Sequence, residues 1–387
     1  MSRLTMALAA AMLAAAFSAP GADAARSVPA DSYIVVLKDN AGDPGAVADE
    51  HGRKHGAKRK KVWRAALKGY VAQIPSGEVA RLRNDPRVAT VERDSVMQAS
   101  ATQSAATWGI DRIDQRYLPL SGSFTYSGNG AGVTAYVVDT GIHPTHAEFG
   151  GRAVSDRDFV DPLNPTGPYY NDGKDCNGHG THVAGTIGGS TYGVAKGVSL
   201  VGVRVLDCEG YGLTSEIIDG INWVTADHDA GERAVANASL GGGASSALDT
   251  AVRNSIADGV TWTIASGNET QNACYSSPAR VSEAITISAS DRSDRRASFS
   301  NYGSCVDWFA PGVGITSAWH SNDTATATIS GTSMAAPHTA GAAALYLERV
   351  PTATPAGVRS ALYNATTKYR IAYSGTANNH LLYTAGL

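Results

Sequence analysis

The stretch that decides the fold begins at residue 133 and reads Val133-Thr134-Ala135-Tyr136-Val137-Val138-Asp139-Thr140-Gly141. Its first six residues are almost all apolar and partly β-branched, which predicts a strand buried on both faces. Similar runs recur at residues 200–206, 234–238, 261–265 and 284–289. Ile, Leu, Val and Ala stand at helical spacing in residues 214–227 and 246–258. This alternation predicts an α/β fold, a doubly wound and mostly parallel sheet with helices on both faces.

A smaller α+β module is predicted upstream, at residues 31–95. We expect its strands at 33–37, 69–74 and 88–92 and its helices at 44–55 and 76–84. Residues 31–98 carry a net charge of +4 and residues 99–387 a net charge of −8, which favours electrostatic docking between the two parts. The basic run at 58–61 is the strongest candidate for nucleic-acid binding, but a solvated face explains it better.

The first residues have the three parts of a secretory signal peptide. Arg3 supplies positive charge, residues 4–17 are an apolar run, and Ala22 and Ala24 place small residues before an expected cleavage site. An apolar run of this length is too short to span a bilayer. We therefore expect residues 1–24 to be removed and the protein to be secreted, without a membrane partner.

Export would place the four cysteines in an oxidising compartment, where disulfides persist. Four cysteines permit three pairings, and their spacing alone does not choose among them. The short spacing that is typical of zinc sites is absent from the sequence. Two disulfides are therefore the better interpretation for Cys176, Cys208, Cys274 and Cys305.

Three glycine-flanked segments carry the residues of a nucleophilic site. Asp139 ends the first core strand, His179 lies in Gly178-His179-Gly180, and Ser333 lies in Gly331-Thr332-Ser333. Each is weak alone, because such residues are more often a turn former, a structural histidine or a helix cap. Together they supply a hydroxyl, a base beside it and a carboxylate that orients the base, in one of the known chain orders. The order and the serine motif both differ from those of α/β-hydrolases, which disfavours a lipase or esterase.

These segments resemble those of the subtilisin-like serine proteases, most closely the proteinase K branch with its aqualysin-like members. The resembling stretches are 108–116, 139–141, 179–186, 239–243, 298–303 and 331–338. The resemblance runs from about residue 101 to the C-terminus, and residues 31–95 resemble the inhibitory propeptide of that family. A catalytically silent relative would have lost a residue of the triad or the oxyanion donor. This sequence contains all of these residues.

The resemblance implies a secreted serine endopeptidase that hydrolyses proteins through an acyl-enzyme. Ser333 would be the nucleophile, His179 the base, and Asp139 the residue that orients His179. Asn268, at the end of an expected core strand, would stabilise the oxyanion together with the Ser333 backbone N–H. His182 would be structural, since no H-E-x-x-H motif accompanies it.

The substrate is expected to bind as an added strand. By resemblance, the flanking residues are Gly210 and Tyr211 on one side and Ser239, Leu240 and Gly241 on the other. The first pocket would be walled by Ala265, Ser266 and Gly267. Because none of these residues is charged, we expect a broad preference for apolar or aromatic side chains.

The resemblance also implies the disulfides Cys176–Cys208 and Cys274–Cys305, and a structural calcium ion. Its ligands would be the Asp307 carboxylate and the carbonyl oxygens of Ser282 and Ala284. A second site would use Asp111, Asp114 and Gln115, but the two later ligand positions are Ser121 and Ser123 here. Asp172 and Asp175 are a further acidic candidate, which a solvated loop explains equally well. Catalysis itself is expected to need no cofactor.

These inferences divide the chain into a signal peptide (1–24), a propeptide (25–100) and a peptidase domain (101–387). We expect the propeptide to assist folding and then to inhibit, and the enzyme to cut itself near Ser100–Ala101. The expected partners are protein substrates and the propeptide. We expect a monomer with no nucleic-acid partner.

Overall fold

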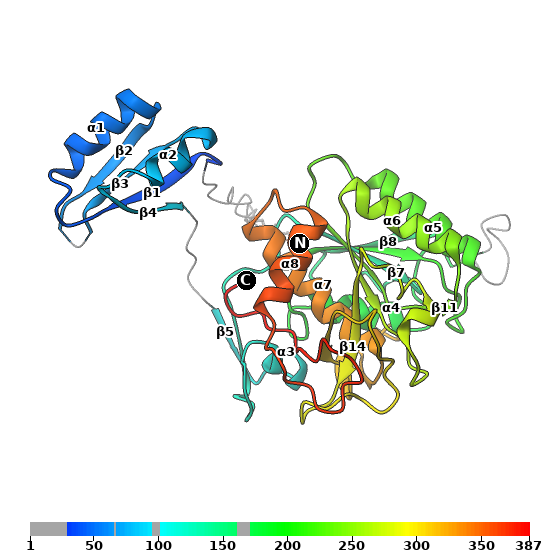
Figure 1. Ribbon diagram of the computed structural model, residues 1–387. Helices are drawn as coiled ribbons and strands as arrows, with labels where there is room; N and C mark the ends of the chain where they lie inside the picture. Colours follow the sequence, from blue (N-terminus) through cyan, green and yellow to red (C-terminus); the bar gives the residue numbers. More distant parts are fainter. Residues whose placement is uncertain (1–28, 66, 95–100, 161–170) are drawn as a thin grey trace, which may run out of the picture. The chain divides into compact units, whose positions relative to one another are not determined.

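The computed structural model describes residues 29–65, 67–94, 101–160 and 171–387. The chain forms two compact units that divide between Met97 and Gln98 (Figure 1). The expected signal peptide lies outside the described residues. The expected cut at Ser100–Ala101 lies at the edge of a described range.

The N-terminal unit is a four-stranded antiparallel sheet with two helices on one face. Its sheet has the order β2-β3-β1-β4, and the same apolar cluster holds residues of the sheet and of both helices. The elements are β1 (Ser32–Leu37), α1 (Pro44–His55), β2 (Lys58–Trp63), β3 (Gly69–Gln73), η1 (Ser76–Glu78), α2 (Val79–Arg83) and β4 (Val88–Arg93). The Asp43 side chain accepts the Ala46 N–H and so begins α1, and Gly56, at φ 67°, ends it.

The sequence did not predict β2. Residues 58–61 are exposed, as expected for a solvated charged face, yet they form an edge strand. Lysines on an edge strand discourage pairing with another chain, so the charge is compatible with a strand at this position.

The second unit is built on a seven-stranded sheet with the order β15-β14-β12-β10-β7-β9-β8. Every neighbouring pair in it is parallel, which confirms the predicted fold class. The strands are β7 (Thr134–Asp139), β8 (Ala153–Asp158), β9 (Ser199–Arg204), β10 (Ala234–Ala238), β12 (Thr261–Ala265), β14 (Ile285–Ser290) and β15 (Trp308–Pro311). The two strands that the sequence did not predict, β8 and β15, are the edges of the sheet. Strand β8 alternates between buried and exposed residues, whereas the four residues of β15 are all buried and form too short a run to stand out in the sequence.

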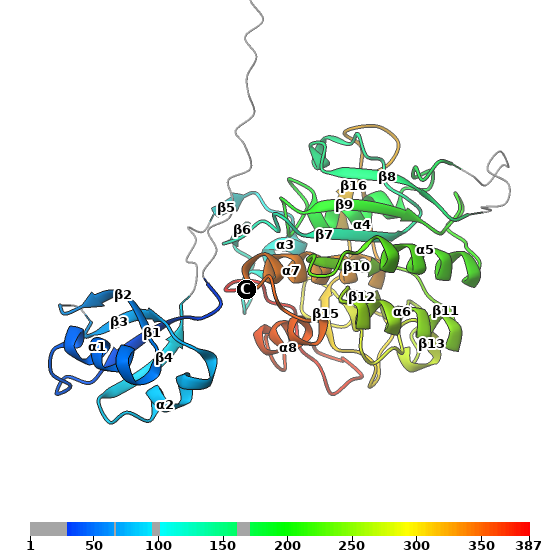
Figure 2. The ribbon, with the colours of Figure 1, turned by 90° about the horizontal axis from the view of Figure 1, so that it is seen from above.

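Helices cover both faces of this sheet (Figure 2). Ala135 and Val137 of β7 belong to the cluster that includes α4 (His179–Gly188), α7 (Thr332–Arg349) and α8 (Pro355–Ala365). Tyr136 and Val138 face the opposite way, into the cluster with α5 (Thr214–Asp227) and α6 (Ser246–Asp258). Successive residues of a strand point to opposite faces, so a strand between two cores must be apolar throughout.

The remaining elements are short. They are β5 (Ala101–Ser104), α3 (Trp108–Ile113), β6 (Ser123–Tyr126), η2 (Ala147–Phe149), β11 (Gly242–Gly243), η3 (Ala273–Tyr275), β13 (Ser276–Ser277), β16 (Ile315–Ala318) and β17 (Thr326–Ile329). In the described part of the chain, no helix combines the length and the apolar character needed to cross a membrane.

The parallel alignment brings the predicted site residues to one edge of the sheet. Asp139 is the last residue of β7, Ser239 directly follows β10, and Ser266 directly follows β12. These three strands are neighbours in the middle of the sheet. Ligands of open α/β sheets bind at the carboxyl ends of the strands, so this edge is the candidate site.

Candidate active site

Asp139 and His179 form a short hydrogen bond at this edge. The Asp139 side chain is fully buried, and its Oδ1 accepts from Nδ1 of His179 at 2.7 Å and from the Thr140 N–H at 2.8 Å. His179 is the first residue of α4, and its side chain is 26% exposed. The carboxylate therefore fixes the ring through Nδ1 and leaves Nε2 as the nitrogen that can exchange a proton.

The surroundings of His179 favour its charged form. Burial alone would lower the pKa of His179, but the charge and hydrogen bond of Asp139 and the charge of Asp175 together raise it above its ordinary value. An imidazolium formed at this position is therefore stabilised by two carboxylates.

Asp175 joins the strand that carries Asp139 to the helix that carries His179. Its Oδ1 accepts from the Thr140 hydroxyl at 2.9 Å and from the N–H groups of Asn177 and Gly178 at 2.9 and 2.8 Å. Its Oδ2 accepts the Thr181 N–H at 2.9 Å and the Thr181 hydroxyl at 2.5 Å. Asp175 is buried, so a solvated loop does not describe it, and both of its oxygens are occupied by hydrogen bonds within the fold. A carboxylate at a helix N-terminus is favoured by the helix dipole.

Ser333 lies in the first turn of α7. A proline one turn later determines which group its carbonyl oxygen contacts. Pro337 lies inside the helix and has no N–H to donate to the carbonyl oxygen of Ser333. The Ser239 hydroxyl donates to that oxygen instead, at 2.8 Å. In return, the Ser333 hydroxyl donates to the Ser239 carbonyl oxygen at 3.1 Å. The start of α7 is thereby fixed to the end of β10.

Asn268 lies across from this helix start. Its Oδ1 accepts both the N–H and the hydroxyl of Thr332, at 2.8 and 2.9 Å. These two bonds orient the amide so that Nδ2 is the free donor. The Ser333 N–H lies in the first turn of α7, where N–H groups have no acceptor within the helix. The site thus offers two N–H donors beside the Ser333 hydroxyl.

Two adjoining cavities meet at these residues. The first, of about 430 Å³, is lined by Ser333, Asn268 and the expected pocket residues Ala265, Ser266 and Gly267. The second, of about 380 Å³, is lined by His179 together with Gly210 and Tyr211. Ser239, Leu240 and Gly241 line both cavities. The structure therefore brings the expected substrate-flanking segments to the same place as Ser333 and His179.

Sequence reasoning missed one charged residue of the first cavity. Glu269 lines it, and its Oε2 accepts from Nδ2 of Asn301 at 2.8 Å. The feature of the sequence that could have indicated Glu269 as a cavity residue was its position directly after Asn268. The pocket is consequently mixed in character, with small residues on its walls and one carboxylate.

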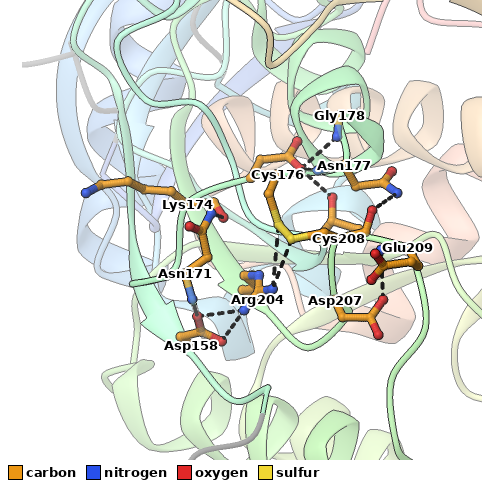
Figure 3. Close-up of a disulfide and its surroundings, with 12 residues drawn as sticks. Asp158, Asn171, Lys174, Cys176, Asn177, Gly178, Arg204, Asp207, Cys208 and Glu209 are labelled. Carbon is orange, nitrogen blue, oxygen red and sulfur yellow. Dashed lines mark hydrogen bonds and ion pairs between the residues drawn. A yellow bond between two sulfur atoms is a disulfide. The ribbon is translucent and has the colours of Figure 1, made fainter. Parts of the chain in front are cut away.

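The two disulfides are Cys176–Cys208 and Cys274–Cys305, the pairing that the resemblance implied. The first lies between the start of α4 and the Gly210 segment, and Figure 3 shows its surroundings. Asn177 donates from Nδ2 to the Cys208 carbonyl oxygen at 2.8 Å. Behind the sulfur atoms, the buried Arg204 pairs with both oxygens of Asp158 at 2.8 and 2.7 Å. This disulfide therefore links the two cavity segments that flank His179.

His182 has a structural environment. It is buried, its Nε2 lies 3.0 Å from the carbonyl oxygen of Ile315, and burial lowers the pKa of His182 to about 4. An imidazole that stays neutral and bound to a backbone carbonyl is a packing element of α4.

The expected calcium ligands at Asp307 do not fit a metal ion. Nε and Nη2 of Arg359 both donate to Oδ1 of Asp307, at 3.0 and 2.5 Å, and the Thr286 N–H donates to Oδ2 at 2.8 Å. Burial raises the pKa of the Asp307 carboxyl, and the Arg359 charge opposes that rise. Across the described residues, no cluster of three or more His, Cys, Asp or Glu side chains could hold a metal.

The second expected calcium segment is only partly compatible with a cation. Asp111 already accepts the Ser121 hydroxyl and N–H on Oδ1 and the Gly122 N–H on Oδ2. Asp114 Oδ2 accepts the Thr125 N–H, whereas its Oδ1 is buried without a partner among the described residues. Burial raises the pKa of Asp114 to about 6.

Comparison with known proteins places this geometry in a family. Residues 130–386 match the subtilase family, and residues 32–100 match the peptidase inhibitor I9 family. The chain belongs to the subtilase family. It is a serine protease with an inhibitor I9 unit before its protease domain.

Its relatives agree with this assignment. An extracellular serine proteinase of Thermus sp. is 52% identical over 94% of this chain and 92% of its own length. Alkaline serine exoprotease A of Vibrio alginolyticus is 49% identical over 84% of this chain, which spans 60% of that protein. The crystal structure of a cold-adapted subtilisin-like serine proteinase is 52% identical with a TM-score of 0.68, over 73% of this chain and 99% of that one. Subtilases need no cofactor for catalysis.

Asp175→Asn should shift the pH dependence of the protease. It removes a negative charge that raises the pKa of His179, so the acid limb of the kcat/KM profile should move to lower pH. The profile should be measured on a peptide substrate from pH 4 to pH 9. Asp172→Asn is the control, because it removes the same charge from an exposed residue three positions away. An acid limb that stays in place in Asp175→Asn would contradict the electrostatic contribution of this carboxylate.

The two disulfides should differ in their effect on activity. Their sequence separations are 32 and 31 residues, so in the chain-entropy account each should stabilise the fold by about 3–4 kcal/mol. Replacing either pair by serine should therefore lower the denaturation midpoint similarly. Cys176→Ser with Cys208→Ser should lower kcat/KM more, because this pair flanks His179, whereas Cys274 adjoins Tyr275, a lining residue of the first cavity outside the proposed triad. Equal kcat/KM in the two double variants, at a temperature where both are folded, would show that the first disulfide does not shape the site.

Proposed function

We propose that this subtilase is a secreted endopeptidase that uses Ser333, His179 and Asp139 as its catalytic triad. The main support for this proposal is the 2.7 Å hydrogen bond between His179 and the buried Asp139. It lies near the cavity that Ser333 lines. A buried carboxylate on Nδ1 is the arrangement that a histidine base needs. The signal-peptide pattern in the sequence of residues 1–24 and the extracellular relatives support secretion.

The proposed reaction begins when the Ser333 hydroxyl turns from the Ser239 carbonyl toward His179. Its oxygen attacks the scissile carbonyl carbon while Nε2 of His179 takes the proton. The oxyanion is stabilised by Nδ2 of Asn268 and the Ser333 N–H. His179 then gives the proton to the leaving amine as the C–N bond breaks. A water molecule, deprotonated by His179, hydrolyses the acyl-enzyme and restores Ser333.

The substrate is proposed to bind extended between Gly210–Tyr211 and Ser239–Gly241. The side chain before the scissile bond would enter the cavity walled by Ala265, Ser266 and Gly267. Its small, uncharged walls suit apolar and aromatic side chains of the substrate. The Glu269 carboxylate would also bind basic side chains. A broad preference follows from this mixed lining.

Maturation is proposed to proceed by self-cleavage near Ala101. Residues 25–100 would first assist folding and then inhibit the protease as its bound propeptide. Their match to the inhibitor I9 family and their positive charge, opposite to that of residues 99–387, support this role. The mature protease is proposed to act as a monomer.

Structural calcium is proposed for the segment of Asp111 and Asp114, and not for Asp307. The Asp114 Oδ1, which has no partner among the described residues, and the hydroxyls of Ser121 and Ser123 would supply oxygen ligands, which a hard cation prefers. The Gln115 side-chain oxygen accepts the Ser121 N–H at 3.1 Å and would have to release it to bind the ion. Bound calcium there would stabilise the fold and take no part in catalysis.

Ser333→Ala should abolish both proteolysis and maturation. Casein hydrolysis should fall by about 10⁶-fold, the loss known from subtilisin itself, and the variant should keep its precursor length. The wild type should digest casein much faster than it digests a triglyceride, and its mature N-terminus should lie near Ala101. A variant that still cleaves casein, with no effect of a serine-directed covalent inhibitor, would exclude Ser333 as the nucleophile.

Glu269→Gln should reduce the acceptance of lysine in the first cavity. An exposed charge pair contributes about 1 kcal/mol or less. We therefore expect kcat/KM for a lysine substrate to fall up to about five-fold relative to the matched phenylalanine substrate. The control is Glu283→Gln, which removes an exposed carboxylate outside the cavity. An unchanged ratio of the two substrates in Glu269→Gln would remove Glu269 from the pocket's selectivity.

A further inference from the structure

The carboxylate of Asp307 is buried and needs a positive partner. It directly precedes β15, and its side chain is 9% exposed. Its backbone N–H donates to the Thr286 carbonyl oxygen at 2.9 Å, and its Oδ2 accepts the Thr286 N–H at 2.8 Å. A carboxylate held in this way cannot turn toward solvent, so its charge must be balanced inside the fold.

Arg359 provides that balance from a rigid element. It lies on α8, whose neighbouring residues Val358 and Leu362 are fully buried in the core that α8 shares with α7. Two of its N–H groups converge on Oδ1 of Asp307, at 3.0 and 2.5 Å. A guanidinium stays charged under all ordinary conditions, so this partner is permanent.

The same oxygens are poor calcium ligands while Arg359 is present, because Oδ1 already accepts two N–H groups of Arg359. Calcium takes six to eight oxygen ligands at about 2.3–2.6 Å, whereas both Asp307 oxygens already accept N–H groups. A second cation beside Oδ1 would also be repelled by the Arg359 charge. The carbonyls of Ser282 and Ala284, which the family resemblance adds to this site, lie just before β14.

We propose that the Arg359 guanidinium replaces the calcium ion that the resemblance implies at Asp307, so that this site is stabilised by the chain's own cation. The inference does not rest on the catalytic roles proposed above. It predicts that the Asp307 site neither needs nor binds calcium as long as Arg359 is present.

The pair also supports a wall of the first cavity. Thr286, which Asp307 holds through its N–H, donates its hydroxyl to the Ala279 carbonyl oxygen at 2.8 Å. Ala279 lines the cavity that contains Ser333. Arg359, Asp307 and Thr286 thus form a continuous set of polar contacts from the surface of α8 to this cavity.

The test is carried out in the full chain with Ser333→Ala, which prevents self-digestion. Melting temperatures are measured with a chelator and with excess calcium chloride, and the calcium-dependent rise is compared among variants. This comparison subtracts any rise that comes from another calcium site. Arg359→Ala should melt about 5 °C lower in chelator, and calcium should restore most of the difference.

Two controls make the result specific. Arg253→Ala removes an exposed arginine that pairs with Glu283, beside the same turn, and should change neither the melting temperature nor the calcium-dependent rise. Adding Asp307→Asn to Arg359→Ala should abolish the gained calcium response.

The proposal is overturned if Asp307→Asn alone reduces the calcium-dependent rise, because Asp307 would then bind calcium despite Arg359. It is also overturned if Arg359→Ala melts as the parent does, or if its loss is not recovered by calcium. Should Arg359→Ala fail to fold, Arg359→Lys keeps the charge and must then fold with the parent's calcium response.

Discussion

The parallel alignment of the central strands is the constraint on which the rest of the molecule depends. Because β7, β10 and β12 run in the same direction, their last residues meet at one edge of the sheet. That edge receives Asp139 from β7, Ser239 from beyond β10 and Asn268 from beyond β12. The helices α4 and α7 begin there and present His179 and Ser333 from their first turns. A mixed sheet would distribute these residues between two opposite edges.

Backbone groups that lack partners organise this edge further. The N-terminus of α4 offers N–H groups that Asp175 accepts, and the same carboxylate holds the residue after Asp139. At α7, the proline at 337 leaves one carbonyl free, and the hydroxyl of Ser239 takes it. In both cases the need to satisfy a buried polar group fixes the position of a residue of the proposed triad.

Charges buried around the sheet are neutralised by arginines. Arg204 pairs with Asp158 behind the first disulfide, Arg112 with Asp294, and Arg359 with Asp307. Each arginine lies on a different element from its carboxylate, so each pair ties two parts of the chain together. Removing one partner would leave a buried charge uncompensated, which costs far more than the intact pair contributes.

The sequence by itself determined the class of fold and the identity of the candidate site residues. Apolar runs such as 133–138 predict doubly covered strands because each successive side chain must enter a core, and the two helices 214–227 and 246–258 have the bounds that their spacing predicted. Edge strands such as β2 and β8 carry no such signal, since one side of each is open to solvent. The tertiary structure alone decided that Glu269 enters the pocket, that Asp175 is buried at the helix start, and that Arg359 meets Asp307 across 52 residues of sequence. Local patterns record which face of a strand or helix is buried, but the partner of a charge depends on distant segments that only folding brings within hydrogen-bonding distance.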